Sequence, residues 1–337
     1  MAGISYLQEF QEPALRGLVT EIENDKAPSL ADRFLPNGQT FSTTFAYDIV
    51  KKSNHIAAYI GYGAEPPVID RDAVAHKMGE VAKLGLKYIA TEEELLALNQ
   101  ARSNAEKSAM IEQLTVKAAD LVNALNKRVD VSKLEALLKG TFSYNKNGVK
   151  INVNYGIGAP AVKAGAEAWT ASTAKPLSDL IAWHDAYVEK NGKAADAIIM
   201  SREALALLQT NDEIITEARG TSGTFSRVSM NEVNDVLAGY GLPNVEVQAQ
   251  RSITVKDVYT GNDEVIEFLP KYRVVFASVG AGQFLFGPTV ENNYQPGIDL
   301  RAYDKFEPIQ SVIRVAAAGV PVIENPDLIF HADVAAE

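Results

Sequence analysis

Histidine and cysteine, the side chains that most often act as metal ligands or nucleophiles, are scarce in this chain. It has four histidines and no cysteine. His55, His76, His184 and His331 are scattered, and no two lie three or four residues apart, as metal ligands on one helix face would. The lack of cysteine excludes disulfides, thiolate metal sites and cysteine nucleophiles. We therefore expect no metal centre, and we expect His184, on an apolar helical stripe, to be a core residue.

Glycine-containing loops are the next candidates, because their backbone N–H groups can bind phosphate. Segments 155–158 and 280–282 each hold a lone Gly-x-Gly, without the third glycine and the following helix of a dinucleotide fingerprint. Segment 220–224 lacks the Gly-Lys pair of a P-loop and the flanking glycine of a nucleophile elbow. We expect turns and a loop here, no cofactor and no enzymatic activity. The alternative is a soluble α+β enzyme or small-molecule-binding protein that uses loop 220–226.

Composition limits the classes of protein further. The 337 residues are 47% hydrophobic, which is enough for one or two packed domains. No run of about 18 apolar residues exists, and the first residues lack a signal segment, so we expect a soluble protein made in the cytosol with no membrane partner. The net charge of −11 argues against a general nucleic-acid-binding surface, which needs Lys and Arg to neutralise phosphates. An acidic wall that faces DNA without binding it is compatible with this charge.

The elements that position these residues are organised around segment 91–140. Thr91 and Glu94 have the spacing of a capping box, which starts a helix. Apolar side chains then recur at three- and four-residue steps, so they share one face of that helix. The stripe consists of Ile111, Leu114, Ala118, Leu121, Val122 and Leu125.

The same helix has a predicted end and a predicted bend. No proline or glycine interrupts residues 91–127, and Gly140 is a suitable C-terminal stop. Ser132 and Glu135 have the spacing of a second capping box. We therefore predict one long spine helix with a bend near residues 129–131.

The first 90 residues are predicted to form an arm and an extended excursion. Residues 1–40 hold short helical pieces divided by prolines, too sparse for a core of their own, so the arm must lie on something else. Residues 41–90 are rich in β-prone side chains, and Pro66-Pro67 cannot lie in a central strand. The return limb, about 78–89, has few large apolar residues and carries Lys83 and Lys87, with Lys77 just before it. We expect this limb to project from the body.

The remainder of the chain has an α+β pattern without internal repeats. Residues 141–155 alternate apolar and polar side chains around a turn at 145–148, which predicts a hairpin. Further helices are predicted from Pro176, Ser201 and Ser229, and further strands at 197–200, 245–247, 265–268, 272–277, 309–315 and 320–323.

The order of these elements resembles that of the lambda-type major capsid proteins, the phage capsid protein E family. The resemblance covers nearly the whole chain and is carried by the arm, the two-strand loop, the long helix with its hairpin, and a series of short segments. These segments are 137–140, Trp169 with 176–180, 197–200, 241–245, 286–288, 307–311, 320–322 and 325–327.

The resemblance implies the Hong Kong 97-type capsid fold, an α+β fold. It places an N-terminal arm at 1–40, an E-loop at 41–90, a peripheral domain with the spine helix at 91–170 and 310–337, and an axial domain at 171–309. Some proteins of this fold cross-link through Lys and Asn, but no residue here matches that motif.

The implied function is that of a structural major capsid protein. It would assemble with itself through pentamers and hexamers into an icosahedral virion shell around double-stranded DNA, in the host cytoplasm. Portal, scaffold and decoration proteins would be its partners, and DNA would face the inner wall without sequence-specific binding. The predicted assembly residues are Glu65, Pro66, Pro67, Asp70, Arg71, Asp72, Lys83 and Lys87. An encapsulin-like bacterial nanocompartment is the alternative within this fold.

Overall fold

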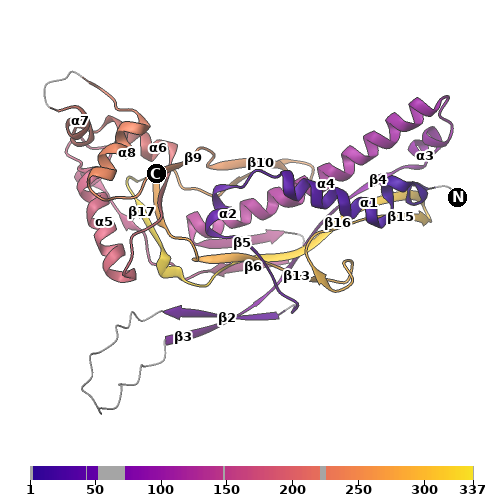
Figure 1. Ribbon diagram of the computed structural model, residues 1–337, viewed down its shortest axis with the longest axis horizontal. Coiled ribbons are helices and arrows are strands. Elements are labelled where there is room, and N and C mark those ends of the chain that lie inside the picture. The colour runs from indigo at the N-terminus through magenta and orange to yellow at the C-terminus, as the bar shows by residue number, and fades with distance from the viewer. Residues whose placement is uncertain (1–2, 43, 52–72, 147–148, 221–224, 337) are drawn as a thin grey trace, which may run out of the picture.

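The computed structural model describes residues 3–42, 44–51, 73–146, 149–220 and 225–336 (Figure 1). Its helices are η1 (Ile4–Tyr6), η2 (Gln8–Phe10), α1 (Glu12–Asp25), α2 (Leu30–Phe34), α3 (Glu92–Asn99), α4 (Asn104–Lys139), η3 (Gly165–Glu167), α5 (Pro176–Asn191), α6 (Arg202–Thr210), α7 (Asp212–Arg219), α8 (Met230–Gly239) and η4 (Pro326–Leu328). Its strands are β1 (Asn37–Gln39), β2 (Thr44–Lys51), β3 (Ala73–Glu80), β4 (Ala82–Ala90), β5 (Thr141–Lys146), β6 (Val149–Asn154), β7 (Ala161–Val162), β8 (Ala197–Ser201), β9 (Val245–Gln248), β10 (Ser252–Lys256), β11 (Asp263–Glu267), β12 (Arg273–Ala277), β13 (Gly282–Thr289), β14 (Gln295–Pro296), β15 (Asp299–Phe306), β16 (Ile309–Ile323) and β17 (Ile329–Asp333).

Strand β16 is the centre of a six-stranded sheet. It pairs with β4 on one side, and on the other with β15 and then β13, which also pairs with β14 and, in parallel, with β1. Alternate residues of β16, including Ile313 and Val315, are fully buried in the cluster that also holds α4 side chains. The two strands predicted at 309–315 and 320–323 are one strand, because the small residues between them keep pairing with β4.

A second sheet has the order β7-β17-β12-β8-β9. Side chains of α5, α6, α7 and α8 pack in the cluster on one of its faces, whereas α2, the C-terminal part of α4 and the β5–β6 hairpin contribute to the cluster on the other. Along β8, Ile198 faces the first cluster and Ile199 the second, and every residue of the strand is buried. Coverage on both faces explains why this strand is a continuous apolar run. Figure 1 shows α5 to α8 gathered at one end of the molecule and α3 at the other.

The predicted spine helix is two helices, and the bend lies elsewhere than predicted. The capping box of Thr91 and Glu94 is confirmed and begins α3. The chain breaks at residues 100–103, where Ser103 caps α4 by accepting a hydrogen bond from the Glu106 N–H at 3.2 Å. Ser103 thereby supplies the start signal that a separate helix needs.

The bend predicted near 129–131 is wrong, because α4 continues unbroken to Lys139. Ser132 does not cap a helix; its hydroxyl donates to the Arg128 carbonyl at 2.8 Å, one turn earlier in the same helix. A serine can sit in a helix interior in this way, so the Ser-x-x-Glu spacing alone does not start a new helix.

The C-terminal end of α4 is buried, and side chains from the second sheet bind its free carbonyls. Gly140 ends the helix as predicted, in a left-handed conformation with φ of 74°. The Arg273 guanidinium donates to the Leu138 carbonyl at 3.1 Å, and His331 Nε2 lies 2.8 Å from the Leu137 carbonyl. Burial, together with the charge of Arg273, lowers the pKa of His331 to about 4. The imidazole is therefore neutral at pH 7, and its Nε2–H donates to the carbonyl.

The predicted arm lies on its own chain. Ile4, Phe10 and Leu15 are buried in the cluster shared with α4 and β15, and Phe34 and Leu35 are buried against the C-terminal part of α4. The arm was predicted to lie on something else, and here it lies on the body of the same chain. Its apolar residues are too sparse for a separate core, but they complete the core of the body.

The excursion is partly as predicted. β2 and β3 form a two-stranded ribbon that leaves the body (Figure 1). The return limb does not project along its whole length, because β4 joins the six-stranded sheet beside β16. In β4 the lysines alternate with Leu84, Leu86 and Tyr88, so one face is apolar enough to pack on the core.

The hairpin predicted at 141–155 is confirmed as β5 and β6. Lys146, at the end of β5, binds Asp257 at 2.9 Å and also pairs with Glu264, so it joins this hairpin to the β10–β11 ribbon. The division into arm, E-loop, peripheral and axial domains stays a prediction. No helix among the described residues is both long and apolar enough to cross a bilayer.

Candidate assembly interface

Two of the eight predicted assembly residues lie in the described part of the chain. Glu65, Pro66, Pro67, Asp70, Arg71 and Asp72 lie outside the described residues. Lys83 and Lys87 lie on β4, and both side chains are exposed on the face of the sheet opposite α4.

The register of the sheet places three cations in a row across three strands. Lys87 is paired directly with Arg314 of β16, and Arg314 with Arg301 of β15. Directly paired residues point to the same face, and like charges in such positions repel each other. We call Lys87, Arg314 and Arg301 the basic row.

Three carboxylates offset part of this repulsion: Glu291, Asp299, and Glu12 of α1, which lies 3.9 Å from the Arg301 guanidinium. Glu291 pairs with Lys83 and lies 3.7 Å from the Arg314 guanidinium. The hydrogen bond from Lys83 lowers the pKa of Glu291, which is therefore ionised at neutral pH. Asp299 accepts from Arg301 Nε at 3.0 Å, and burial raises the pKa of Asp299 although Arg301 opposes this shift. The Arg314 guanidinium also lies 5.8 Å from the centre of the Tyr303 ring, within cation–π range.

Lys87, at the open end of the basic row, forms no salt bridge with another side chain in the described part of the chain. The sequence prediction named Lys83 and Lys87 but missed Arg301, Arg314, Asp299 and Glu291. Their proximity depends on the pairing register of β4, β16 and β15, for which the sequence carries no short motif.

A strained turn lies beside Glu291, between β13 and β14. Asn293 and Tyr294 have φ angles of 52° and 61°, the left-handed region that non-glycine residues rarely occupy. Backbone hydrogen bonds from Asn293 to Val290 and from Tyr294 to Thr289 hold this conformation. The Tyr294 side chain is 70% exposed. The two adjacent asparagines were the available signal, because Asn tolerates this conformation better than most residues.

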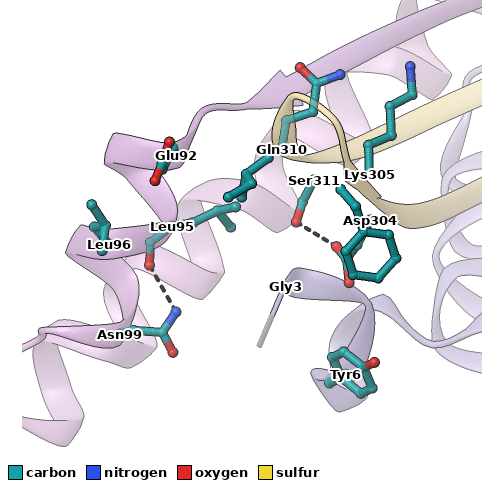
Figure 2. A pocket seen from close by; sticks show the side chains of 12 residues that line it. Gly3, Tyr6, Glu92, Leu95, Leu96, Asn99, Asp304, Lys305, Gln310 and Ser311 are labelled. Atoms are coloured by element: carbon teal, nitrogen blue, oxygen red, sulfur yellow. Dashed lines mark hydrogen bonds between the residues drawn. The ribbon is translucent and has the colours of Figure 1, made fainter. Parts of the chain in front are cut away.

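An exposed apolar hollow of about 200 Å³ lies at the far end of the molecule, between α3, η1 and the β15–β16 turn (Figure 2). Tyr6, Leu96 and Phe306 line it and are at least half exposed. Asp304 also lines it and accepts hydrogen bonds from the Ser5 and Ser311 hydroxyls, both at 2.5 Å. Figure 2 shows the bond between Ser311 and Asp304 beside this hollow.

The described residues contain no cluster of three or more His, Asp or Glu side chains placed to hold a metal ion. His184 is buried on α5, as predicted, and His331 serves the end of α4. Gly156 and Gly280 have positive φ angles, which fits their prediction as turn residues. Of the loop in the alternative prediction, residues 221–224 lie outside the described part.

Comparisons with known proteins find solved structures of capsid and other phage-related proteins that resemble nearly the whole chain. A structure assigned as the capsid protein of an Escherichia coli CFT073 prophage is 15% identical, with a TM-score of 0.60 over 96% of this chain and 98% of that chain. A phage-related protein from Bordetella bronchiseptica RB50 is 11% identical, with a TM-score of 0.55 over 95% and 96%. A chain of the satellite phage P4 procapsid, whose structure includes the size determination protein Sid, is 10% identical, with a TM-score of 0.50 over 96% and 99%.

At these identities the structural likenesses show the fold, which is the Hong Kong 97-type capsid fold. No curated protein sequence matches the chain. The model of the family described as phage major capsid protein E matches residues 15–334. The chain therefore belongs to the phage major capsid protein E family, and it is a structural protein of a capsid shell and not an enzyme.

Proposed function

We propose that copies of this chain assemble through pentamers and hexamers into a closed icosahedral shell around phage double-stranded DNA. Assembly would take place in the host cytoplasm, with portal, scaffold and decoration proteins as partners. In this proposal residues 1–40 are the arm, 41–90 the E-loop, 91–170 with 310–337 the peripheral domain, and 171–309 the axial domain. Glu65, Pro66, Pro67, Asp70, Arg71, Asp72, Lys83 and Lys87 would lie at contacts between subunits.

The observation that carries the proposal is the β2–β3 ribbon. In the described part of the chain its strands pair only with each other, and the ribbon stands off the body (Figure 1). An isolated two-stranded ribbon is at best marginally stable in water. Contact with a neighbouring subunit would supply the missing support. The scaffold proposal draws on the P4 procapsid, whose structure includes the Sid protein.

Electron microscopy and light scattering of the purified chain, alone and with its scaffold protein, test the proposal. We expect closed shells, or rings of five and six subunits. Particles no larger than dimers in both preparations, across concentration and salt, would contradict it.

A second experiment tests the role of the excursion. Replacing residues 52–72 by a short Gly-Ser turn should leave the subunit folded, because Lys51 and Ala73 are directly paired and a short loop can join them. We expect cooperative thermal unfolding to be retained and shell closure to be lost. Unimpaired shells would show that the excursion is not an assembly element, and an unfolded subunit would show that it belongs to the core.

A further inference from the structure

Strand β4 has one edge without a neighbouring strand. In the described part of the chain it pairs only with β16, and all nine of its residues take part in that pairing. In an antiparallel pair alternate residues turn their N–H and C=O groups toward the partner, so the other residues of β4 turn theirs to the open edge. A strand of this length presents an edge of roughly 30 Å. Natural proteins cover or disrupt such edges because they readily pair with another chain.

The apolar face of β4 is also incompletely covered. Leu84, Leu86 and Tyr88 point to the core face, yet each is only partly buried. Their directly paired partners on β16, which are Ala317, Val315 and Ile313, are fully buried. Burial therefore falls off toward the open edge, where an added strand would continue both the hydrogen-bond ladder and the apolar layer.

The opposite face of the same edge is positively charged. The basic row ends at the exposed Lys87, and Lys83, which pairs with Glu291, lies four residues away on the same face of β4. The whole chain carries a net charge of −11. A second copy of this chain therefore brings an excess of carboxylates to a locally basic edge, and the two are complementary in charge.

We propose that the open edge of β4 receives an extended segment of a second copy as an added strand, with Lys87 facing acidic side chains of that copy. This inference rests on the proposed function, because a shell places a second copy beside every subunit. Backbone pairing would supply affinity, and the alternation of apolar and basic faces would fix the register of the added strand.

Amide hydrogen exchange at single-residue resolution tests the added strand directly. It compares the free subunit with shells formed from the same chain. In the free subunit every second amide between residues 82 and 90 should exchange fast, and in shells these amides should slow by at least about tenfold, as expected for newly formed ladder bonds. If shells form and these amides stay fast, the inference fails and the proposed function stands. If no shells form from the unaltered chain, the proposed function itself fails.

A matched pair of charge reversals tests the contribution of Lys87. Lys87→Glu should slow shell formation at least about tenfold at low salt, since rim charges act mainly on association rates. Lys117→Glu, a charge reversal at another exposed lysine, on α4, should leave the rate within about twofold under the same reasoning. Thermal melts establish that both variants are folded. Equal rates for the two variants, whether both slow or both normal, would overturn the role of Lys87.

Discussion

The ion pair between Asp32 of α2 and Lys133 of α4 gives the sharpest test of how the arm is held. Lys133 Nζ lies 2.5 Å from the Asp32 carboxylate, and the lysine side chain has no exposed surface. Lys26 lies 3.8 Å from Asp32 and 2.6 Å from Asp130, so two cations and two anions share the site. Burial lowers the pKa of Lys133, although Asp32 opposes this shift. Of these four charged groups, the Lys133 ammonium is therefore the one whose burial costs the most free energy.

The loss of unfolding free energy depends on which partner of the pair is removed. Asp32→Ala leaves the fully buried Lys133 without its hydrogen-bond partner, and breaking a buried pair in this way costs about 3–5 kcal/mol of unfolding free energy. Lys133→Met should cost less, because Asp32 is 21% exposed and still faces Lys26. Combining Lys133→Met with Asp32→Asn removes both charges, and replacement of both members of a buried pair is often close to neutral. The double variant should therefore be more stable than Asp32→Ala.

Urea unfolding of the isolated subunit measures these differences, provided that the slope of each transition is unchanged. The control is Asp120→Ala, which removes the partner of Lys117 in an exposed pair at 3.9 Å and should cost less than about 0.5 kcal/mol. If Asp32→Ala cost no more than Asp120→Ala, Lys133 would have access to water and the arm would not be docked on α4 in solution.

Further predictions concern the helix end, the helix face and the charge. The pKa of His331 is about 4 in the folded state and 6.5 in the unfolded state, so between these pH values the unfolded state binds more protons. This contribution to stability is therefore complete above pH 6.5 and is lost as pH falls toward 4. In His331→Gln, the unfolding free energy measured with urea should lack this dependence on pH. Gly140→Ala should lower the melting temperature, because φ at this position is 74° and the new Cβ would lie 3.2 Å from His331. Gly17→Ala is the control: it lies in α1 with open space around it, so the change should raise the unfolding free energy by up to about 1 kcal/mol. Val122→Asp should cost several kcal/mol by burying an unpaired carboxylate, and Lys117→Ala should stay within about 0.5 kcal/mol, by the same unfolding assay. Emptied shells should bind DNA weakly at physiological salt, and nanomolar binding with a steep salt slope would contradict the acidic-wall prediction.

Local signals in the sequence predicted element starts and ends well. The capping boxes at Thr91 and Ser229 are both present, and Gly140 ends α4. The same Ser-x-x-Glu spacing at Ser132 and Glu135 did not start a helix, because both residues are buried inside α4, where the helix packs against the core. A capping box describes what a helix start needs, and it carries no information on whether the preceding residues leave the helix.

The placement of β4 and of the arm could not be predicted from local patterns. The sequence of β4 looks weakly apolar because about half of its residues face solvent. Only the pairing register with β16 shows that Leu84 and Leu86 complete the apolar face that packs on the core. The sequence of the arm indicates too few apolar residues for a core of its own, and this is correct for the arm taken alone. Its burial depends on α4 and β15, which are distant in sequence.

The buried charges were also missed, and they bear on how α2 and the C-terminal end of α4 are held in place. Apolar contacts between the arm and α4 are nondirectional, so they would allow α2 to slide along the helix. Lys133 pairs with Asp32 in one position only, and Arg273 fixes the other end of α4 by binding the Leu138 carbonyl. A closed shell repeats one interface many times, so a small variation in subunit shape would be multiplied around each ring. We infer that these polar contacts are retained for positional specificity more than for net stability, which is why removing both charges of the Asp32–Lys133 pair should affect shell closure more than it affects the unfolding free energy.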